Sequence, residues 1–291
     1  MAWKPTEIPD QTGRTFVITG ANGGLGAETT KVLASKGATV IMACRNVAKA
    51  TEVAAGIPGD VRTAALDLAD LSSIRRFAEE APAVDVLVNN AGIMYVPFSR
   101  TKDGFETQFG VNHLGHFALT GLLLDRITDR VVTVSSIAHK QLPKFHVDDL
   151  NYENRRYQRN FAYAQAKLAN LMFARELQRR LSEAGSTKRS YGVHPGVSAT
   201  DLFAHSETPL DLISKPFIKI VGHSPAKAAH SSLFAATMPD ADPTKYWGPT
   251  RLMQSQGPVE SAPSTRLSRD KDLWLRLWTE SERMTGVTYP L

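Results

Sequence analysis

The 291-residue sequence predicts one α/β domain built on a doubly wound parallel sheet with helices on both faces. Short apolar runs alternate with longer amphipathic segments, which is the pattern of repeated βαβ units. The runs are rich in valine and isoleucine, as buried parallel strands are. No internal repeat, low-complexity tract or linker divides the sequence into two domains.

The expected elements follow one another along the chain. Strands are expected at residues 14–19, 38–43, 61–66, 84–89, 130–135 and 189–194. Helices should begin near Gly24, Val47, Asp70 and Asp103, and a longer helix should cover residues 158–183. Crossovers of one hand between these strands would build a doubly wound sheet. Ligands on such sheets bind at the carboxyl ends of the strands. Residues 1–12 are expected to form a loose arm before a domain covering residues 13–291.

Composition excludes several classes of protein. A hydrophobic content of 42% and a charged content of 22% are those of a soluble globular protein rather than a disordered or fibrous one. The single cysteine, Cys44, excludes an internal disulfide and a thiolate cluster for a metal. No signal-peptide layout is present, and no window approaches the roughly 20 apolar residues that span a bilayer. We therefore expect a cytoplasmic protein without a metal.

The net charge of +5 could suggest a nucleic acid as partner. The basic residues are scattered among acidic ones, however, and form no stripe with stacking aromatic residues. A mildly basic surface and a small-molecule substrate are the favoured interpretation.

A glycine-rich turn follows the first expected strand and reads Thr19-Gly20-Ala21-Asn22-Gly23-Gly24-Leu25-Gly26. The glycines permit a tight bend, close approach of the backbone to a pyrophosphate, and close packing of the next helix on the sheet. Amides at the start of that helix would face the anion. Such motifs also arise by chance in loops, but this position between strand and helix predicts the dinucleotide site of a Rossmann fold.

The choice of coenzyme is predicted where the second strand ends. Enzymes that use NAD carry an acidic residue roughly 20 residues after the glycines, whereas this sequence has Cys44 followed by Arg45. Arg45 could form a charge-assisted fork to a 2′-phosphate and stack on adenine, with Lys49 one helical turn further on. The sequence therefore favours NADP(H), the alternative being a solvated arginine at a strand end.

Tyr163 and Lys167 stand four residues apart, which places a phenol and an ammonium on one face of a helix. A phenol with an ordinary pKa near 10 must approach neutrality to exchange protons efficiently. Lys167 and a positive nicotinamide ring would favour the phenolate, and a pKa lowered by about two units corresponds to about 2.7 kcal/mol. The pair predicts hydride transfer assisted by a tyrosine acid or base, the alternative being an aromatic residue packed in the core.

Together these motifs resemble the short-chain dehydrogenases/reductases, in order and over nearly the whole chain. The resemblance implies a catalytic tetrad of Asn112, Ser136, Tyr163 and Lys167, with Ser136 preferred to Ser135. It also implies a helix distortion at Asn112 that holds a water linking Lys167 to solvent. The residues expected to bind the coenzyme are Gly20, Asn22, Gly23, Gly24, Leu25, Gly26, Arg45, Asp67, Leu68, Asn90, Ala91, Gly92, Tyr163, Lys167, Ser198 and Thr200.

Within the family, the run Asn112-His113-Leu114-Gly115-His116-Phe117 is most similar to the retinol-dehydrogenase and protochlorophyllide-reductase branch, which generally prefers NADP(H). Ser136 and Tyr163 are 27 residues apart, and the charged segment 140–159 between them should make a surface excursion near the substrate mouth. Residues 200–225 should form an apolar lid, which suggests a lipophilic carbonyl or alcohol. An amphipathic surface helix is the alternative for that segment.

Other features have simpler interpretations. His113 and His116 lack a third ligand in register, so packing explains them better than a metal. Trp274 and Trp278 predict the apolar face of a terminal helix. A coenzyme-binding sensor or scaffold with vestigial catalysis is the rival function, and a sugar-nucleotide epimerase or dehydratase is disfavoured by length. Family members often pair through the helices bearing Asn112 and Tyr163, so a homodimer or homotetramer is expected, with a monomer left open.

Overall fold

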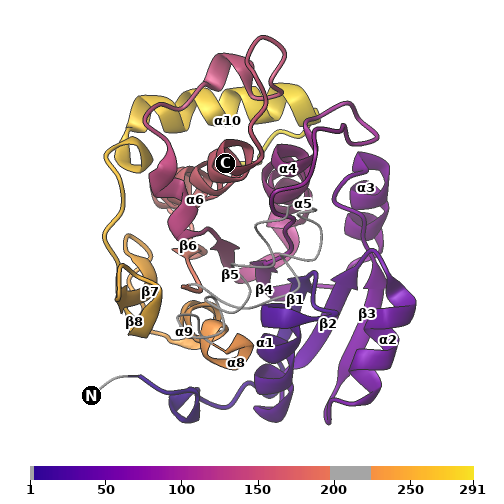
Figure 1. Cartoon of the computed structure of the whole chain (residues 1–291). Coiled ribbons are helices and arrows are strands. Elements are labelled where there is room, and N and C mark those ends of the chain that lie inside the picture. Colours follow the sequence, from indigo (N-terminus) through magenta and orange to yellow (C-terminus); the bar gives the residue numbers. More distant parts are fainter. Residues whose placement is uncertain (1–2, 197–223) are drawn as a thin grey trace, which may run out of the picture.

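The computed structural model describes residues 3–196 and 224–291 and consists of one mixed sheet between two layers of helices (Figure 1). The strand order is β3-β2-β1-β4-β5-β6-β7-β8. All neighbouring pairs are parallel except β7 and β8, which are antiparallel. The strands are β1 (Thr15–Thr19), β2 (Thr39–Cys44), β3 (Val61–Ala65), β4 (Val84–Asn89), β5 (Ile127–Val134), β6 (Arg189–Val193), β7 (Tyr246–Arg251) and β8 (Gln256–Ser261).

Helices alternate with the strands, as the sequence predicts. The order of the strands reverses between β1 and β4, so the carboxyl ends of these two strands flank the switch point of the sheet. The longer helices are α1 (Gly24–Ser35), α2 (Val47–Ala55), α3 (Leu71–Glu80), α5 (Gly115–Leu123), α6 (Arg159–Glu183), α9 (His230–Thr237) and α10 (Lys271–Thr285). The shorter ones are α4 (Thr107–Phe109), the π-helix Gly110–Leu114 and α8 (Pro225–Ala228).

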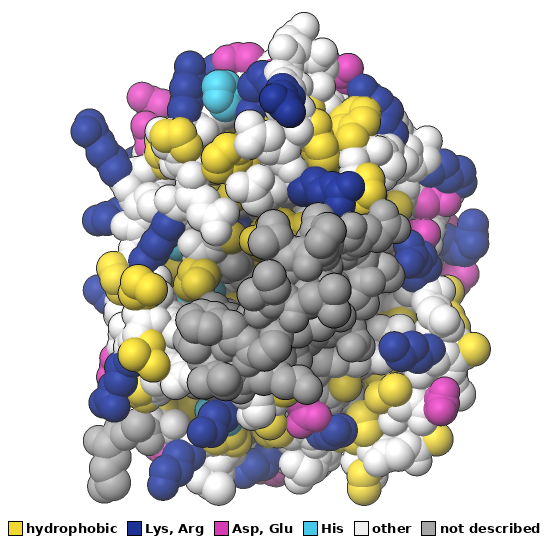
Figure 2. Space-filling model, in the orientation of Figure 1, with side chains coloured by type: hydrophobic (Ala, Val, Ile, Leu, Met, Phe, Trp, Pro, Cys, Tyr) yellow, Lys and Arg dark blue, Asp and Glu magenta, His cyan; other side chains and the backbone are white. Residues whose placement is uncertain are grey.

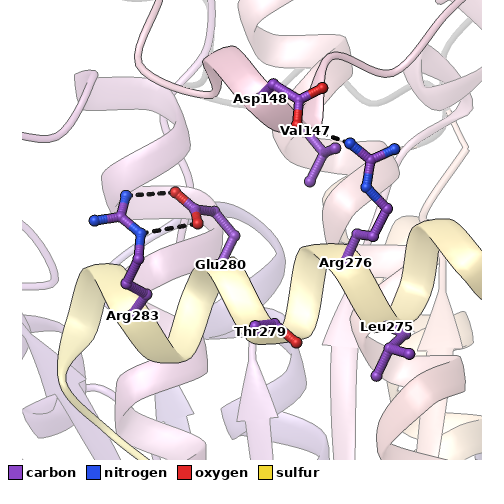
Figure 3. A pocket seen from close by; sticks show the side chains of 7 residues that line it. All are labelled: Val147, Asp148, Leu275, Arg276, Thr279, Glu280 and Arg283. Carbon is purple, nitrogen blue, oxygen red and sulfur yellow. Dashed lines mark hydrogen bonds and ion pairs between the residues drawn. The ribbon is translucent and has the colours of Figure 1, made fainter.

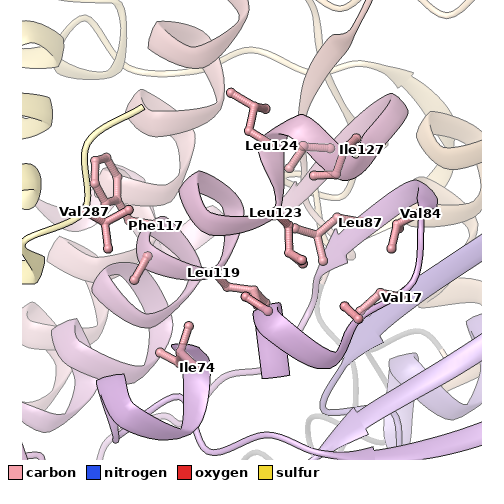
Figure 4. Packing of buried hydrophobic residues seen from close by; sticks show 14 of the residues in the cluster. Val17, Ile74, Val84, Leu87, Phe117, Leu119, Leu123, Leu124, Ile127 and Val287 are labelled. Carbon is pink, nitrogen blue, oxygen red and sulfur yellow. The ribbon is translucent and has the colours of Figure 1, made fainter. Parts of the chain in front are cut away.

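The core has one apolar layer on each face of the sheet. On one face, Val17 and Leu87 of the strands pack with Ile74 of α3 and with Phe117 and Leu119 of α5 (Figure 4). On the other face, alternate residues of the same strands pack against α1, α2 and α9. The central strands β1, β2 and β4 are buried on both faces and are nearly continuous apolar runs, and this made them detectable in the sequence.

Two strands escaped prediction. β7 contains Gly248 and Pro249, and β8 contains Gly257 and Pro258, residues that depress strand propensity. Proline is tolerated near the edge of a sheet, where β8 is the last strand, because a missing amide donor is less costly there. The hairpin extends the sheet beyond the six strands expected.

The amino-terminal segment is not the loose arm that was expected. The ring of Trp3 packs edge-on against Phe234 of α9 with centroids 5.4 Å apart, and Ile8 is buried. Lys36, next to the end of α1, donates to the carbonyl of Ile8 at 2.9 Å. Apolar anchors at Trp3 and Ile8 therefore hold residues 3–12 against the domain.

The excursion between Ser136 and Tyr163 packs more closely than its charge suggests. Phe145, Val147 and Leu150 are buried in a cluster with residues of α6 and α10. Arg276 of α10 pairs with Asp148 of the excursion at 2.7 Å. Trp278, also on α10, is buried in the core, as the spacing of the two tryptophans predicts.

Within residues 3–196 and 224–291, no helix is both long and apolar enough to cross a bilayer.

Candidate active site

The glycine-rich turn joins β1 to α1, and its backbone requires glycine at two positions. Gly20 has a φ of +64°, and a Cβ added there would lie 2.9 Å from the Cα of Ala91. A Cβ added at Gly26 would lie 2.7 Å from the Cα of Ala21 and 2.8 Å from Nδ2 of Asn90. Real Cβ atoms do not approach other atoms so closely, so the turn fits tightly against the end of β4.

The start of α1 is suited to an anion. Its N-cap is Gly23, and no side chain accepts a hydrogen bond from the first amides of the helix. Other helices have such a cap, for example Asn46 at α2, Asp70 at α3 and Asp270 at α10. Free amides at a helix start bind phosphate well, so this part of the turn fits the pyrophosphate of a dinucleotide. The remaining predicted contacts of the turn, Asn22, Gly24 and Leu25, are partly exposed.

The ends of β1 and β4 are joined by hydrogen bonds at the switch point. Thr19 Oγ1 accepts from the amides of Asn90 and Ala91, each at 2.9 Å. Asn90 Nδ2 donates to the carbonyl of Thr19 at 2.8 Å. Asn89 points to the other side and donates to Thr120 Oγ1 of α5 at 2.9 Å. These bonds fix the segment that precedes Gly92, the last of the coenzyme contacts expected here.

The ends of β2 and β3 present the residues expected near the adenosine. Arg45 and Lys49 are exposed at the junction of β2 and α2. Asp67 follows β3, and its Oδ1 accepts from the amide of Ala69 at 2.9 Å, which shapes a tight turn. Leu68 is buried behind it.

Tyr163 and Lys167 lie on the buried face of α6, with 4% and 3% of their surface exposed. Lys167 Nζ is 5.8 Å from the centre of the Tyr163 ring. The same Nζ donates to the carbonyl of Val134, the last residue of β5, at 3.0 Å, and Asn170 Nδ2 donates to that carbonyl at 3.1 Å. These two bonds hold α6 against the carboxyl end of β5.

The two serines after β5 have different environments. Ser135 is buried, and its hydroxyl donates to the carbonyl of Lys167 at 2.6 Å. Ser136 is partly exposed, and its Oγ accepts from the amide of Ala138 at 3.2 Å, at the start of the 3₁₀-helix Ile137–Gln141. The hydroxyl of Ser135 is therefore used to bind α6 to the end of β5, while the hydroxyl of Ser136 hydrogen-bonds Tyr163.

Asn112 lies in the π-helix Gly110–Leu114, so the expected distortion of the helix is present. Its side chain pairs with the backbone of Ile93, accepting from the amide at 2.8 Å and donating to the carbonyl at 2.9 Å. A Cβ added at Gly92 would lie 3.2 Å from Asn112 Oδ1 and 3.5 Å from Lys167 Nζ. A side chain at position 92 would therefore crowd Asn112 Oδ1, and glycine lets the backbone pass close to Asn112 and Lys167.

Burial acts on the pKa values of this site. It lowers the pKa of Lys167 to about 8, because a buried ammonium loses hydration. It raises the pKa of the Tyr163 phenol well above its ordinary value, and the Ser136 hydroxyl opposes that shift. In the protein alone, the pKa of Tyr163 is set by burial, the Ser136 hydroxyl and Tyr95, while the Lys167 ammonium donates to the carbonyl of Val134.

Two residues beside Tyr163 were not anticipated. Met94 and Tyr95 pack against it, with the Tyr95 ring edge-on and 5.6 Å from the Tyr163 ring. Tyr95 has a φ of +58°, and its amide donates to Oε1 of Gln108 at 2.8 Å. In the sequence, only their position just after the expected coenzyme contact Gly92 could have indicated that they lie near the site. Ser198, Thr200 and nearly all of the expected lid, 200–225, lie outside the described residues.

A hollow on the outer surface of α10 is separate from this site (Figure 3). It is lined by Val147 and Asp148 and by five residues of α10. The charged groups in it pair with one another, Asp148 with Arg276 and Glu280 with Arg283. On the face drawn in Figure 2, the described lysine and arginine side chains are spread around the periphery among acidic and apolar ones.

A glycine turn at the switch point of a doubly wound sheet, beside a buried tyrosine and lysine, defines the class of short-chain dehydrogenases. The family model described as short chain dehydrogenase matches residues 14–147. The chain is 40% identical to human retinol dehydrogenase 13 over 96% of this chain and 86% of that protein. It is 46% identical to human retinol dehydrogenase 12 over 95% of this chain and 88% of that protein.

A solved structure agrees with these relatives. An uncharacterized protein from Mycobacterium paratuberculosis superposes with a TM-score of 0.87 at 44% identity, covering 100% of both chains. The protein belongs to the short-chain dehydrogenase/reductase family, in its retinol-dehydrogenase-like branch. It is an NAD(P)-dependent oxidoreductase.

Proposed function

We propose that the protein transfers a hydride between NADP(H) and a lipophilic carbonyl or alcohol, with Tyr163 as general acid or base. The observation that carries the proposal is that Lys167 Nζ lies 5.8 Å from the centre of the Tyr163 ring and, with Asn112 Oδ1, beside Gly92, close to the glycine turn. A bound nicotinamide supplies or accepts the hydride. In the reductive direction Tyr163 donates a proton to the carbonyl oxygen, and Ser136 donates a hydrogen bond to the same oxygen. Both donors oppose the negative charge that develops there.

Replacing the phenol tests this role. Tyr163→Phe should retain coenzyme binding and lose about a hundredfold or more of turnover, because only the proton donor is removed. Tyr191→Phe is the matched control. It also removes a buried hydroxyl, which donates to the carbonyl of Ala241 at 3.0 Å on the opposite side of β6 from the catalytic groups. Near-normal turnover in Tyr163→Phe would contradict the proposal. A wild-type protein that binds NADPH but consumes none across a broad carbonyl panel would favour the sensor function.

The preference for NADP(H) rests on Arg45 and Lys49, which are exposed where β2 ends and no acidic residue follows the strand. Arg45→Asp should weaken NADPH binding by about tenfold to a hundredfold, the value of a charge-assisted hydrogen bond, and leave NADH within about threefold. Arg76→Asp, the same charge change on α3 on the opposite face of the sheet, should affect neither. Equal wild-type affinities for NADPH and NADH, measured by fluorescence titration, would refute the assignment.

The preference for a lipophilic substrate rests on the apolar surroundings of Tyr163. Met94 and Tyr95 line one side, and Leu142 of the excursion packs against the same cluster. Retinol dehydrogenases among the relatives agree with such a substrate. Retinoid, steroid and long-chain carbonyls should have higher kcat/KM than small polar aldehydes. The reverse order in a substrate screen would contradict this proposal.

A further inference from the structure

We propose that His116 is a positioning residue that links the backbone of Asn112 to the end of β1 at the coenzyme turn. This inference rests on the proposed function. The His116 side chain, on α5, is 1% exposed. Its Nδ1 lies 2.9 Å from the carbonyl oxygen of Asn112, and its Nε2 lies 2.9 Å from Thr19 Oγ1.

The partners of the ring determine which nitrogen carries the proton. The carbonyl of Asn112 can only accept, so Nδ1 must donate to it. Thr19 Oγ1 already accepts from the amides of Asn90 and Ala91, so its hydroxyl is left to donate. It donates to Nε2 at 2.9 Å, since the other acceptor in reach, the carbonyl of Val88, lies at 3.4 Å. The neutral tautomer with the proton on Nδ1 therefore gives both ring nitrogens, the Asn112 carbonyl and the Thr19 hydroxyl a hydrogen-bond partner.

The surroundings keep this tautomer neutral. Burial lowers the pKa of His116 to about 4, and the charge of Lys167 acts in the same direction. His113, the other titratable side chain on this stretch of helix, is also buried, and burial lowers its pKa to about 3. Neither imidazole carries a charge at neutral pH, so the directed chain of hydrogen bonds persists.

Asn112 is held at two points, by its side chain and by its backbone carbonyl. The side chain of Asn112 is held by Ile93, which follows β4, and its backbone carbonyl is held through His116 by Thr19, which ends β1. The π-helix Gly110–Leu114 is a single-turn departure from α-helical hydrogen bonding, so these bonds add contacts that fix Asn112 within it. By holding the backbone of Asn112, His116 helps to place its side chain, whose Oδ1 lies with Lys167 Nζ beside Gly92, and so affects the environment of the Lys167 ammonium.

The first experiment uses the protein without coenzyme. Correlation of the imidazole ¹⁵N and ¹H signals should show His116 protonated at Nδ1 and bare at Nε2 from pH 5.5 to 8. A proton on Nε2, or titration of the ring near its ordinary pKa, would overturn the inference.

The second experiment compares two histidines of the same helix segment. His116→Asn keeps a short amide donor for the Asn112 carbonyl and loses the bond to Thr19. The ¹³Cε signal of Lys167 should then titrate at a pKa changed by half a unit or more, and turnover should fall about tenfold to a hundredfold with little change in coenzyme affinity. His113→Asn is the matched control, since His113 is also 1% exposed and bonds Ser281. It should lower stability and change the Lys167 titration by less than His116→Asn does, because His113 reaches Lys167 only through Asn170 and the Val134 carbonyl that both side chains bond.

The outcomes separate this inference from the proposed function. Equal Lys167 titrations in wild type and His116→Asn, or equal effects of the two histidine variants, would show that His116 is only structural. Thr19→Ser, which keeps the hydroxyl, should preserve the ¹⁵N pattern of the ring, and Thr19→Val should abolish it. A wild-type protein inactive with NADPH would refute the proposed function, while the two NMR measurements would still test the link.

Discussion

Lys167 and Tyr163 lie on the same face of α6, and burial moves their pKa values apart, each in the direction that favours the neutral form of that group. The pKa of Lys167 falls to about 8, and the pKa of Tyr163 rises. Position i and i+4 on a helix was enough to predict their proximity. The hydrogen bond from Lys167 to Val134 was not predictable, because it joins α6 to a strand 33 residues earlier in the chain.

Lys167 should make stability depend on pH in the alkaline range. Its pKa is about 8 in the folded protein and 10.5 unfolded, so the unfolded state binds more protons between these values. The free energy of unfolding should therefore gain a rising contribution from pH 8 to 10, on the order of 3 kcal/mol in all. Lys167→Met should abolish this rise in urea titrations at several pH values. An unchanged slope in the variant would contradict the assigned pKa.

At the scale of elements, helix α1 and the turn before it depend on close packing. Predicting the turn required only the order of its glycines, since their backbone role is local. The partner that crowds Gly26, Asn90 beside β4, could not be identified without the fold. The β7–β8 hairpin is a similar case, because its strands carry weak local propensity and are stabilised by pairing at the edge of the sheet.

Gly26→Ala should damage the coenzyme site. The added methyl would meet backbone atoms of Ala21 and Gly20 at 2.7 and 2.8 Å, so the turn must shift. We expect a loss of about 1–3 kcal/mol in stability and at least about tenfold weaker coenzyme binding. Gly56→Ala is the control, since its nearest neighbour, the carbonyl of Val53, would lie at an ordinary 3.6 Å. Calorimetry and fluorescence titration measure the two effects, and equal behaviour of the variants would argue against a tight turn.

For the whole molecule, stability at acid pH should depend on histidines that are buried in their neutral form. His113 and His194 have pKa values lowered to about 3, and His116 and His139 to about 4, in each case chiefly by burial. In the sequence, His113 and His116 were interpreted as packing residues. The burial of these histidines follows from the packing of distant elements, as when the His194 ring contacts Tyr246 of β7 with centroids 5.0 Å apart.

Acid should destabilise the folded protein before the histidines themselves titrate in it. Below the ordinary pKa of about 6.5, the unfolded chain binds protons that the folded one does not. The free energy of unfolding should thus fall steadily from pH 6.5 to 4. In His113→Phe, which places a ring among Phe109, Phe117 and Phe173, proton uptake on unfolding at pH 5 should decrease by about one. Undiminished uptake would mean that His113 is charged in the folded protein.

The sequence alone determined the features that depend on neighbours along the chain. The six predicted strands, the glycine turn, and the tyrosine and lysine on one helical face follow from local periodicity and spacing, and the family follows from the resemblance of the ordered motifs. Tertiary structure decided where Trp3 and Ile8 pack, how the edge hairpin pairs, and which atoms Lys167 and His116 contact. The bond from Thr19 to His116 joins residues 97 positions apart. Such contacts depend on how helices and strands pack across the sheet, and no short sequence pattern encodes that geometry.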